Sequence, residues 1–337
     1  MNETYDVVVV GGGAAGLSGA KALSRARRSV LVVDAGEPRN ASAGHVHNYL
    51  GREGTPPGEL VAIGRDEVRE YGGEIVEATV TAAVRAGDGF RVTLADGRSV
   101  GARRLLVTTG LTDELPDIGG LAGRFGRDVL HCPYCHGWEV RDQAIGVVGS
   151  NPMAVHAAQM WRQLSADVTL FRHRVPELTG GEREELAARG IRVVEGEVAA
   201  VEVEDDRLTG VRMRSGEVVP RQVVVVAPRF TANSGLLTAL GLELTDQVMQ
   251  GHVVGSFVAA DPTGATSVPG VWVAGNVTNL MAQVVVSASG GLMAGVAINA
   301  DLIAEDTRAA VAAHRAGVFD GESEVSELVL GARRHGI

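Results

Sequence analysis

The first 35 residues carry the feature that most constrains the fold. In "YDVVVVGGGAAGLSGAKALSRARRSVLVVDAG", an apolar run from Asp6 to Val10 leads into a glycine-rich turn. A helical pattern then covers about Ala14 to Arg27, and a second apolar run follows from Ser29 to Val33. Apolar runs of this length are typical of strands buried on both faces of a parallel sheet. The segment therefore predicts a βαβ unit.

The turn of this unit has the spacing of a dinucleotide-binding fingerprint. It reads Gly11-x-Gly13-x-x-Gly16, and the second strand ends at Asp34. Glycines allow the backbone to approach a pyrophosphate at the positive end of the helix, and the acidic residue can bind ribose hydroxyls. We predict a dinucleotide site here. The alternative is a tight strand–helix turn without a ligand.

A second βαβ pattern has a less complete turn. Its strand covers Ala144 to Val148, its helix about Pro152 to Leu164, and its next strand Val168 to Phe171. Asn151 stands where the fingerprint has its middle glycine, so its side chain would crowd a pyrophosphate. We expect the same fold with an impaired nucleotide site. Between the two units, short alternating strands from about Tyr71 predict a small antiparallel insertion.

The overall charge and the first residues of the chain bear on its binding partners and its location in the cell. The chain has 41 Asp and Glu against 31 Lys and Arg, a net charge of -10, which disfavours nucleic acid as a partner. No export signal is recognisable at the start, and we expect no apolar stretch of the roughly 18 residues that cross a bilayer. These features predict a cytoplasmic protein without a membrane partner.

Both cysteines of the chain lie in "HCPYCHGWEV", as Cys132 and Cys135. A C-x-x-C-His run can attach haem, and Cys with His can bind zinc. Haem attachment needs export, however, and the four clustered groups including His131 cannot all reach one tetrahedral metal. A reversible dithiol/disulfide pair is favoured over these and over inert thiols, with His136 as the proton-transfer group.

Together these motifs resemble the low-molecular-weight thioredoxin reductase family of flavoprotein disulfide oxidoreductases over nearly the whole chain. "GGGAAGLSGA", "LLVTTG", the C-x-x-C and "TSVPGVWVAGNV" carry the resemblance. It implies an α/β fold with two Rossmann-like, three-layer ββα domains. Residues 1–115 and 230–337 would form a discontinuous FAD domain, residues 116–229 a pyridine-nucleotide-type domain with the cysteines, and the protein a homodimer.

The resemblance also assigns cofactor contacts to individual residues. Asn48 matches an Asn that the family places before Pro-Gly, although Leu replaces that Pro here, and Asn276 stands where the family has an Asp at the flavin ribityl chain. The implied FAD contacts are Gly11, Gly13, Ala15, Gly16, Asp34, Asn48, Thr109, Gly110, Gly275, Asn276 and Gln283.

The C-x-x-C-His-Gly form is similar to a branch of dithiol oxidases that close disulfides in natural products of the gliotoxin and holomycin type. We therefore expect an FAD-dependent oxidase of a small dithiol with oxygen as acceptor, in which Cys132 meets the substrate, Cys135 faces the flavin and His136 is the acid/base. The alternative is an NADPH-dependent thioredoxin reductase-type enzyme, for which the basic run Arg172-His173-Arg174 is partial support. A flavin-bearing sensor without turnover is a third hypothesis.

Four residues near these motifs have less defined roles. His45 and His47 precede Asn48 and are weak candidates for catalysis, because loop histidines are generally solvated. Trp138 and Glu139 follow the cysteine motif and either shape its pocket or pack against it.

Overall fold

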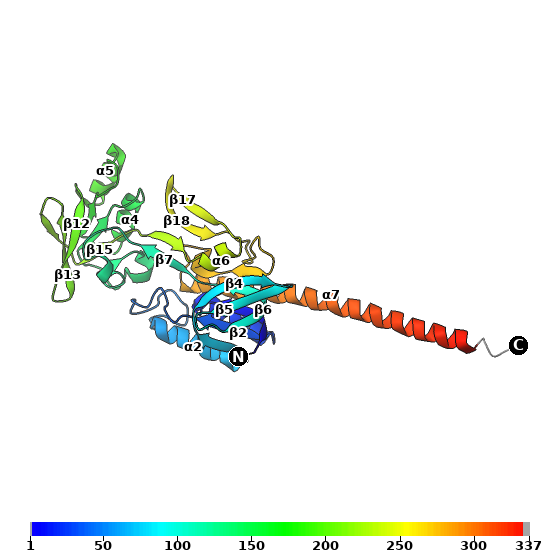
Figure 1. Cartoon of the computed structure of the whole chain (residues 1–337). Helices are drawn as coiled ribbons and strands as arrows, with labels where there is room; N and C mark the ends of the chain where they lie inside the picture. The colour runs from blue at the N-terminus through cyan, green and yellow to red at the C-terminus, as the bar shows by residue number, and fades with distance from the viewer. Residues whose placement is uncertain (1, 333–337) are drawn as a thin grey trace.

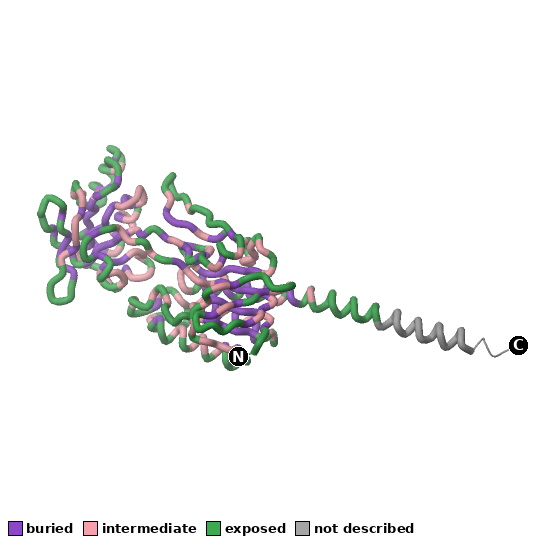
Figure 2. Tube along the Cα trace, viewed as in Figure 1, coloured by how far each residue is buried: buried purple, intermediate pink, exposed green. Residues whose placement is uncertain are grey.

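The computed structural model describes residues 2–332, and the side chains of residues 2–316. In Figure 1 the middle of the chain, coloured green, gathers at one end of the body, and the long helix α7 (Val284–Ala332) leaves the other end. Most buried residues lie inside the sheets of the body, as the purple segments in Figure 2 show. The body therefore holds the cores, and helix α7 extends beyond them.

The first βαβ unit forms as predicted and lies at the centre of a seven-stranded sheet. Strand β1 pairs in parallel with β2 on one side and with β6 on the other, so that Val10 lies between Val33 and Val107. The strands are β1 (Thr4–Val10), β2 (Val30–Asp34), β3 (Glu74–Glu77), β4 (Val80–Ala86), β5 (Gly89–Leu94), β6 (Ser99–Val107) and β19 (Val271–Val273). The predicted antiparallel insertion is β4 and β5, which continue the sheet from β6.

The alternation of side chains along β1 separates two cores. Val7 and Val9 pack on the face covered by α1 (Ala14–Arg25), with Val68 of α2 (Pro57–Glu70) and the start of α7. Tyr5 and Val8 pack on the opposite face with β4 and β5. Successive side chains of a strand point to opposite faces, so one apolar strand serves both cores. The unit has three layers, as predicted.

The second βαβ unit repeats this plan. A five-stranded parallel sheet has the order β11-β10-β9-β15-β8, with α4 and α5 in the core on one face and the β12-β13-β14 sheet in the core on the other. The strands are β8 (Val129–Leu130), β9 (Ile145–Val148), β10 (Val168–Phe171), β11 (Arg192–Val194), β12 (Val198–Glu204), β13 (Arg207–Met213), β14 (Val218–Pro220) and β15 (Val223–Val225). The helices are α3 (Pro133–His136), α4 (Ala154–Trp161) and α5 (Gly180–Ala188), with a 3-10 turn at Ala122–Arg124.

Two paired strands connect the units. Strand β7 (Leu111–Glu114) enters the second unit and β16 (Arg229–Ala232) leaves it, and the two are antiparallel neighbours in a sheet with β17 (Leu244–Met249) and β18 (His252–Val258). The short helix α6 (Gly235–Ala239) and a 3-10 turn at Gly275–Val277 complete the described elements. We propose domain limits at about residues 115 and 230, because the chain changes sheets there.

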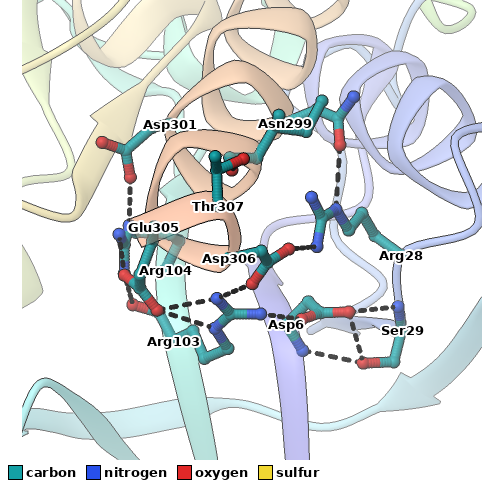
Figure 3. A network of polar contacts seen from close by, with 11 residues as sticks. Asp6, Arg28, Ser29, Arg103, Arg104, Asn299, Asp301, Glu305, Asp306 and Thr307 are labelled. Carbon is teal, nitrogen blue, oxygen red and sulfur yellow. Dashed lines mark hydrogen bonds and ion pairs between the residues drawn. The ribbon is translucent and has the colours of Figure 1, made fainter. Parts of the chain in front are cut away.

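Glycines allow α7 to lie against α1. A Cβ at Gly291 would stand 1.9 Å from the carbonyl oxygen of Ala15, and one at Gly295 2.8 Å from that of Gly19. Figure 3 shows the ion pairs that anchor the helix where it leaves the body, with Arg103 and Arg104 binding Glu305. The network also includes Asp6, Arg28, Ser29, Asn299, Asp301 and Asp306.

The expectation about apolar stretches is wrong for this helix. By length and composition alone, its Val284–Ala316 part is sufficient to cross a membrane. Ala294, Ile298 and Leu302 of the same part are buried in the core with α1. Core helices of soluble proteins pass the same test, so core packing accounts for part of this apolar character.

Candidate active site

A cavity of about 1150 Å³ brings most of the predicted site residues together. It runs from the first glycine turn, past the ends of the neighbouring parallel strands, to the cysteine pair. Ligands of parallel sheets bind at this carboxyl edge. The predicted residues that line it are Gly11, Gly13, Ala15, Asp34, Thr109, Gly110, Cys132, Cys135, His136, Gly275, Asn276 and Gln283.

The three fingerprint glycines have different roles in the turn. Gly11 has a φ of +102°, and a Cβ there would lie 2.6 Å from the oxygen of Thr108. Gly16 does not line the cavity, and its Cβ would lie 1.9 Å from the oxygen of Gly11, so this glycine serves strand–helix packing. A Cβ at Gly13 would meet nothing within 4 Å. Gly13 therefore leaves open the space that a pyrophosphate needs.

Asp34 lies beside the glycine turn and is held by two donors. Its carboxylate accepts hydrogen bonds from the Gly12 backbone at 2.9 Å and from Arg65 at 2.5 Å. Sequence reasoning missed Arg65, which reaches the cavity from α2. Its Nε is buried without a partner in the structure. Arg65 therefore orients the Asp34 carboxylate at the cavity and keeps a buried polar group beside it.

The cysteine pair lies at the far end of the cavity as a disulfide. Cys132 precedes the one-turn helix α3, its carbonyl accepts from the Cys135 backbone at 3.2 Å, and the Cα atoms are 5.3 Å apart. Pro133 at the first helical position favours this start, because its fixed φ suits a helix. Both cysteines are half-buried, and Tyr134 between them is exposed.

Two histidines flank the pair in different environments. Burial lowers the pKa of His131 to about 4, and its ring packs edge-on against Phe230 at 5.0 Å. Burial also lowers the pKa of His136, although the charge of Glu139 acts in the opposite direction. Both rings are therefore neutral at pH 7 and able to accept a proton.

Asn48 lies against the cysteine motif and does not line the cavity. Its side-chain amide donates to the Tyr134 carbonyl at 2.6 Å, and its φ of +60° turns the loop at that point. The contact joins the loop before α2 to the helix of the cysteines. Its predicted role as a flavin contact stays a prediction.

Asn276 shows why an amide can replace the expected carboxylate. Its Nδ2 donates to the carbonyls of Asn279 at 3.1 Å and Ala282 at 3.0 Å. A carboxylate cannot donate these bonds. The side chain thus closes the turn that leads to Gln283 and α7. Thr109, also predicted, exchanges hydrogen bonds with Asn233, a residue that sequence reasoning missed.

Arg39 is a further residue without a sequence signal. Its guanidinium forms a two-pronged ion pair of 2.6 Å with Asp113 of β7 and lies over the Phe230 ring of β16, 5.5 Å from its centroid. Arg39 therefore ties the first unit to both connecting strands. These contacts join positions far apart in the sequence, which explains why no local pattern revealed them.

The family pattern of pyridine nucleotide-disulphide oxidoreductases matches residues 5–291. The chain belongs to this family. The expected thioredoxin reductase-like fold and enzyme class are thereby confirmed, and FAD is the cofactor of such proteins.

Known relatives agree with this assignment. The thioredoxin reductase sirT of Leptosphaeria maculans is 30% identical, with 90% of this chain and 96% of the relative covered, and the thioredoxin reductase tcpT of Claviceps purpurea is 29% identical with the same coverage. The crystal structure of HlmI superposes with a TM-score of 0.86 at 46% identity, covering 94% of this chain and 98% of HlmI. These similarities support the predicted branch of the family.

The residues present fit FAD. The open face at Gly13 and the free first-turn N–H groups of α1, which has no side-chain cap, suit a pyrophosphate. Asp34 and the unpartnered Nε of Arg65 offer polar groups to the rest of a dinucleotide. The fingerprint that the sequence identified thus lies in a cavity able to hold the family cofactor.

The second turn differs from the first in its side chains and in where its helix begins. The Asn151 side chain accepts from the Met153 backbone at 2.9 Å, directly before α4. Helix α4 begins at Ala154, so Pro152 precedes the helix and does not occupy its first turn. Asn151 therefore puts a bonded side chain at the position of the middle fingerprint glycine, although α4 itself begins without a side-chain cap.

The basic run after β10 is also used within the protein. Arg172 forms an ion pair with Glu195 and donates to the Val175 carbonyl at 2.8 Å. His173 is buried and accepts from the Val198 backbone at 3.0 Å. Arg174 is the exposed member of the run. The run thus presents less positive charge to a ligand than its sequence suggests.

Proposed function

We propose that this flavoprotein is a dithiol oxidase. It forms a disulfide in a small-molecule dithiol through Cys132 and Cys135, and oxygen accepts the electrons. Two electrons and two protons leave the dithiol and reach oxygen as hydrogen peroxide, so the overall reaction balances. FAD, when bound, supplies the two-electron link between the reduced cysteines and oxygen.

The roles of the cysteine motif follow from thiol–disulfide exchange. A substrate thiolate attacks the Cys132 sulfur, and the Cys132–Cys135 bond breaks. The second substrate thiolate then releases Cys132, leaving a product disulfide and two cysteine thiols. Cys135 is the member that faces the flavin in this proposal. His136 accepts the proton of the attacking thiol, which is possible because its ring is neutral at pH 7.

The observation that carries this proposal is the self-satisfied second turn. A reductase needs a pyridine nucleotide as electron donor, whereas an oxidase does not. Here Asn151 bonds to the Met153 backbone where a pyrophosphate would approach, and Arg172 is paired with Glu195. These contacts occupy groups that could otherwise serve NADPH, so they favour electron entry from the dithiol.

The surroundings of the cysteine pair favour a small substrate. Both cysteines line the cavity and are half-buried, and the loop that contains Asn48 is bonded to the backbone of α3. A small dithiol can reach the sulfur atoms beside this loop, whereas a folded protein would have to approach around it.

The direct test is steady-state turnover of small dithiols in air. We expect disulfide and hydrogen peroxide in equal amounts without added NADPH, and at least about a hundredfold less from Cys135→Ser, because an exchange pair needs both thiols. The alternative is an NADPH-dependent thioredoxin reductase-type activity. Turnover of a thioredoxin disulfide that depends strictly on NADPH, without peroxide formation from dithiols, would contradict the proposal and establish the alternative.

We also propose that the protein is a homodimer and that the exposed apolar side chains of α7 lie in the contact. Leu292, Met293 and Val296 each expose close to half of their surface on this helix. Large exposed apolar patches commonly mark interfaces. Light scattering should give about twice the chain mass of 35.1 kDa, and Met293→Glu should lower it. A monomer in the unchanged protein would contradict this proposal.

A further inference from the structure

A group of ionisable side chains beside the cysteine pair has no role in the function proposed above. Glu139 follows His136 by three residues, just after α3. His47 and Glu53 belong to the loop between β2 and α2. The group therefore joins two segments that are about 90 residues apart in the sequence, and it lies next to the motif that performs the chemistry.

Direct contacts hold this group together. The Nδ1 of His47 lies 2.5 Å from Glu53, and its Nε2 lies 3.4 Å from Glu139. The second oxygen of Glu53 accepts from the Asn48 backbone at 2.9 Å, and Asn48 is itself bonded to Tyr134. Although it belongs to a loop, the His47 side chain is only 18% exposed. Each nitrogen of its ring thus faces one carboxylate.

His136 has a specific need for a nearby negative charge. It is partly buried, and this burial disfavours the protonated ring. Of the described charged groups, Glu139 favours protonation of His136, and His47 opposes it. His131, on the other side of Cys132, is neutral at pH 7 because it is buried. Glu139 is therefore the group that counteracts the effect of burial.

We propose that Glu139 is a positioning residue that keeps His136 basic enough to accept the proton of a thiol, and that His47 of the facing loop holds Glu139 in place. The acid/base unit is then complete only when the loop of residues 45–53 lies against α3. This inference rests on the proposed function only in requiring thiol–disulfide exchange at Cys132 and Cys135.

The proton balance of the exchange shows where the unit acts. His136 takes the proton of the attacking substrate thiol and gives it to the sulfur that leaves, so no net proton is stored on the ring. A ring that is too weakly basic does not take the proton. Glu139 acts through its charge and does not touch the substrate.

The first test is the anaerobic reduction of the FAD-loaded protein by dithiothreitol, followed by stopped flow across pH. Glu139→Gln should slow this reduction about threefold at pH 7, because only part of a loss of about one unit in the basicity of the ring appears in the rate of proton transfer. Removal of a nearby negative charge lowers the pKa of His136, so the acidic limb of the profile should move to lower pH. Glu139→Asp should recover most of the rate.

A second readout does not depend on the flavin. The reduced protein is alkylated with iodoacetamide across pH, and the modified cysteine is counted by mass spectrometry. A protonated His136 stabilises a neighbouring thiolate, so Glu139→Gln should move the alkylation profile to higher pH. The two profiles therefore move in opposite directions. Profiles that stay in place in both measurements would overturn the role of Glu139.

His47 gives the test of the anchoring contact. His47→Gln should move both profiles in the same directions as Glu139→Gln, by a smaller amount, and should add little in the double variant. Displacement in the opposite directions would mean that His47 acts only as a competing charge, and would overturn the anchoring role.

A matched control is Glu202→Gln, which removes an equal charge from the exposed Glu202–Arg212 pair of β12 and β13. It should leave both profiles unchanged. Failure of oxygen to reoxidise the protein would contradict the oxidase proposal alone, because neither of these measurements contains oxygen.

Discussion

The two strand–turn–helix units of this chain share a fold and differ in what their turns leave open. In the first unit, a Cβ at Gly13 would meet nothing within 4 Å, and α1 begins without a side-chain cap. In the second unit, α4 also begins without a side-chain cap, but a side chain, Asn151, stands at the middle fingerprint position and accepts from the Met153 backbone. Parallel-sheet architecture therefore supplies a possible nucleotide site twice. The residue at this position decides how much space the turn leaves for a ligand.

The largest effect is expected from a substitution at Gly13, in the turn of the first unit. Gly13→Val should fold, because the new side chain points into open space, and should lose FAD by more than about a hundredfold in affinity, because it occupies the space of the pyrophosphate. The ratio of flavin to protein absorbance measures occupancy, and circular dichroism checks the fold. Full occupancy in a folded variant would show that the first turn does not hold the cofactor.

Only one of the two cysteines should lie against the flavin bound by the first unit, so their single substitutions should give different absorbance spectra. Cys132→Ser leaves Cys135, which we place against the flavin, so a long-wavelength charge-transfer band should develop as the remaining thiol ionises. Cys135→Ser should lack this band. Absorbance spectra of the two variants between pH 6 and 9 provide the measurement. Identical spectra would contradict the assigned order of the pair.

A smaller loss of FAD affinity is expected from a substitution at Arg65. Its Nε is buried without a partner beside Asp34, so we expect Arg65→Lys to weaken FAD binding about tenfold, as the loss of a hydrogen bond from a charged group would. Arg69→Lys on the same helix replaces an exposed arginine paired with Asp66 and is the control. Equal affinities in the two variants would remove Arg65 from the site.

A substitution at Asn151, in the turn of the second unit, should increase the affinity for a nucleotide by a small amount. Asn151→Gly removes the side-chain bond to Met153 and restores the glycine of the fingerprint, so NADPH affinity should rise, by about tenfold or less. The loss of this hydrogen bond should lower the free energy of unfolding by about 1 kcal/mol. Calorimetric titration with NADPH and thermal melting test both effects. Unchanged affinity would mean that Asn151 is not what limits the second site.

The sequence predicted those parts of the site that depend on local patterns. The glycine spacing and apolar strands indicated the first βαβ unit, and two cysteines in one turn indicated the redox pair. Arg39 and Arg65 were missed because their partners, Asp113 and Asp34, come from other elements. The length of the apolar stretch in α7 was underestimated, because scattered polar residues interrupt it in the sequence. Contacts between distant segments determine these features, and periodicity does not report them.

Electrons should enter this protein from a dithiol at the cysteine pair and not from NADPH at the second turn. Anaerobic titration of the FAD-loaded protein, followed by flavin absorbance, tests it most directly. We predict that a small dithiol bleaches the flavin within the time of one turnover, and that NADPH at micromolar concentration bleaches it at least about a hundredfold more slowly, because Asn151 and Arg172 are bonded within the protein. Rapid bleaching by NADPH, with none by dithiols, would contradict the account.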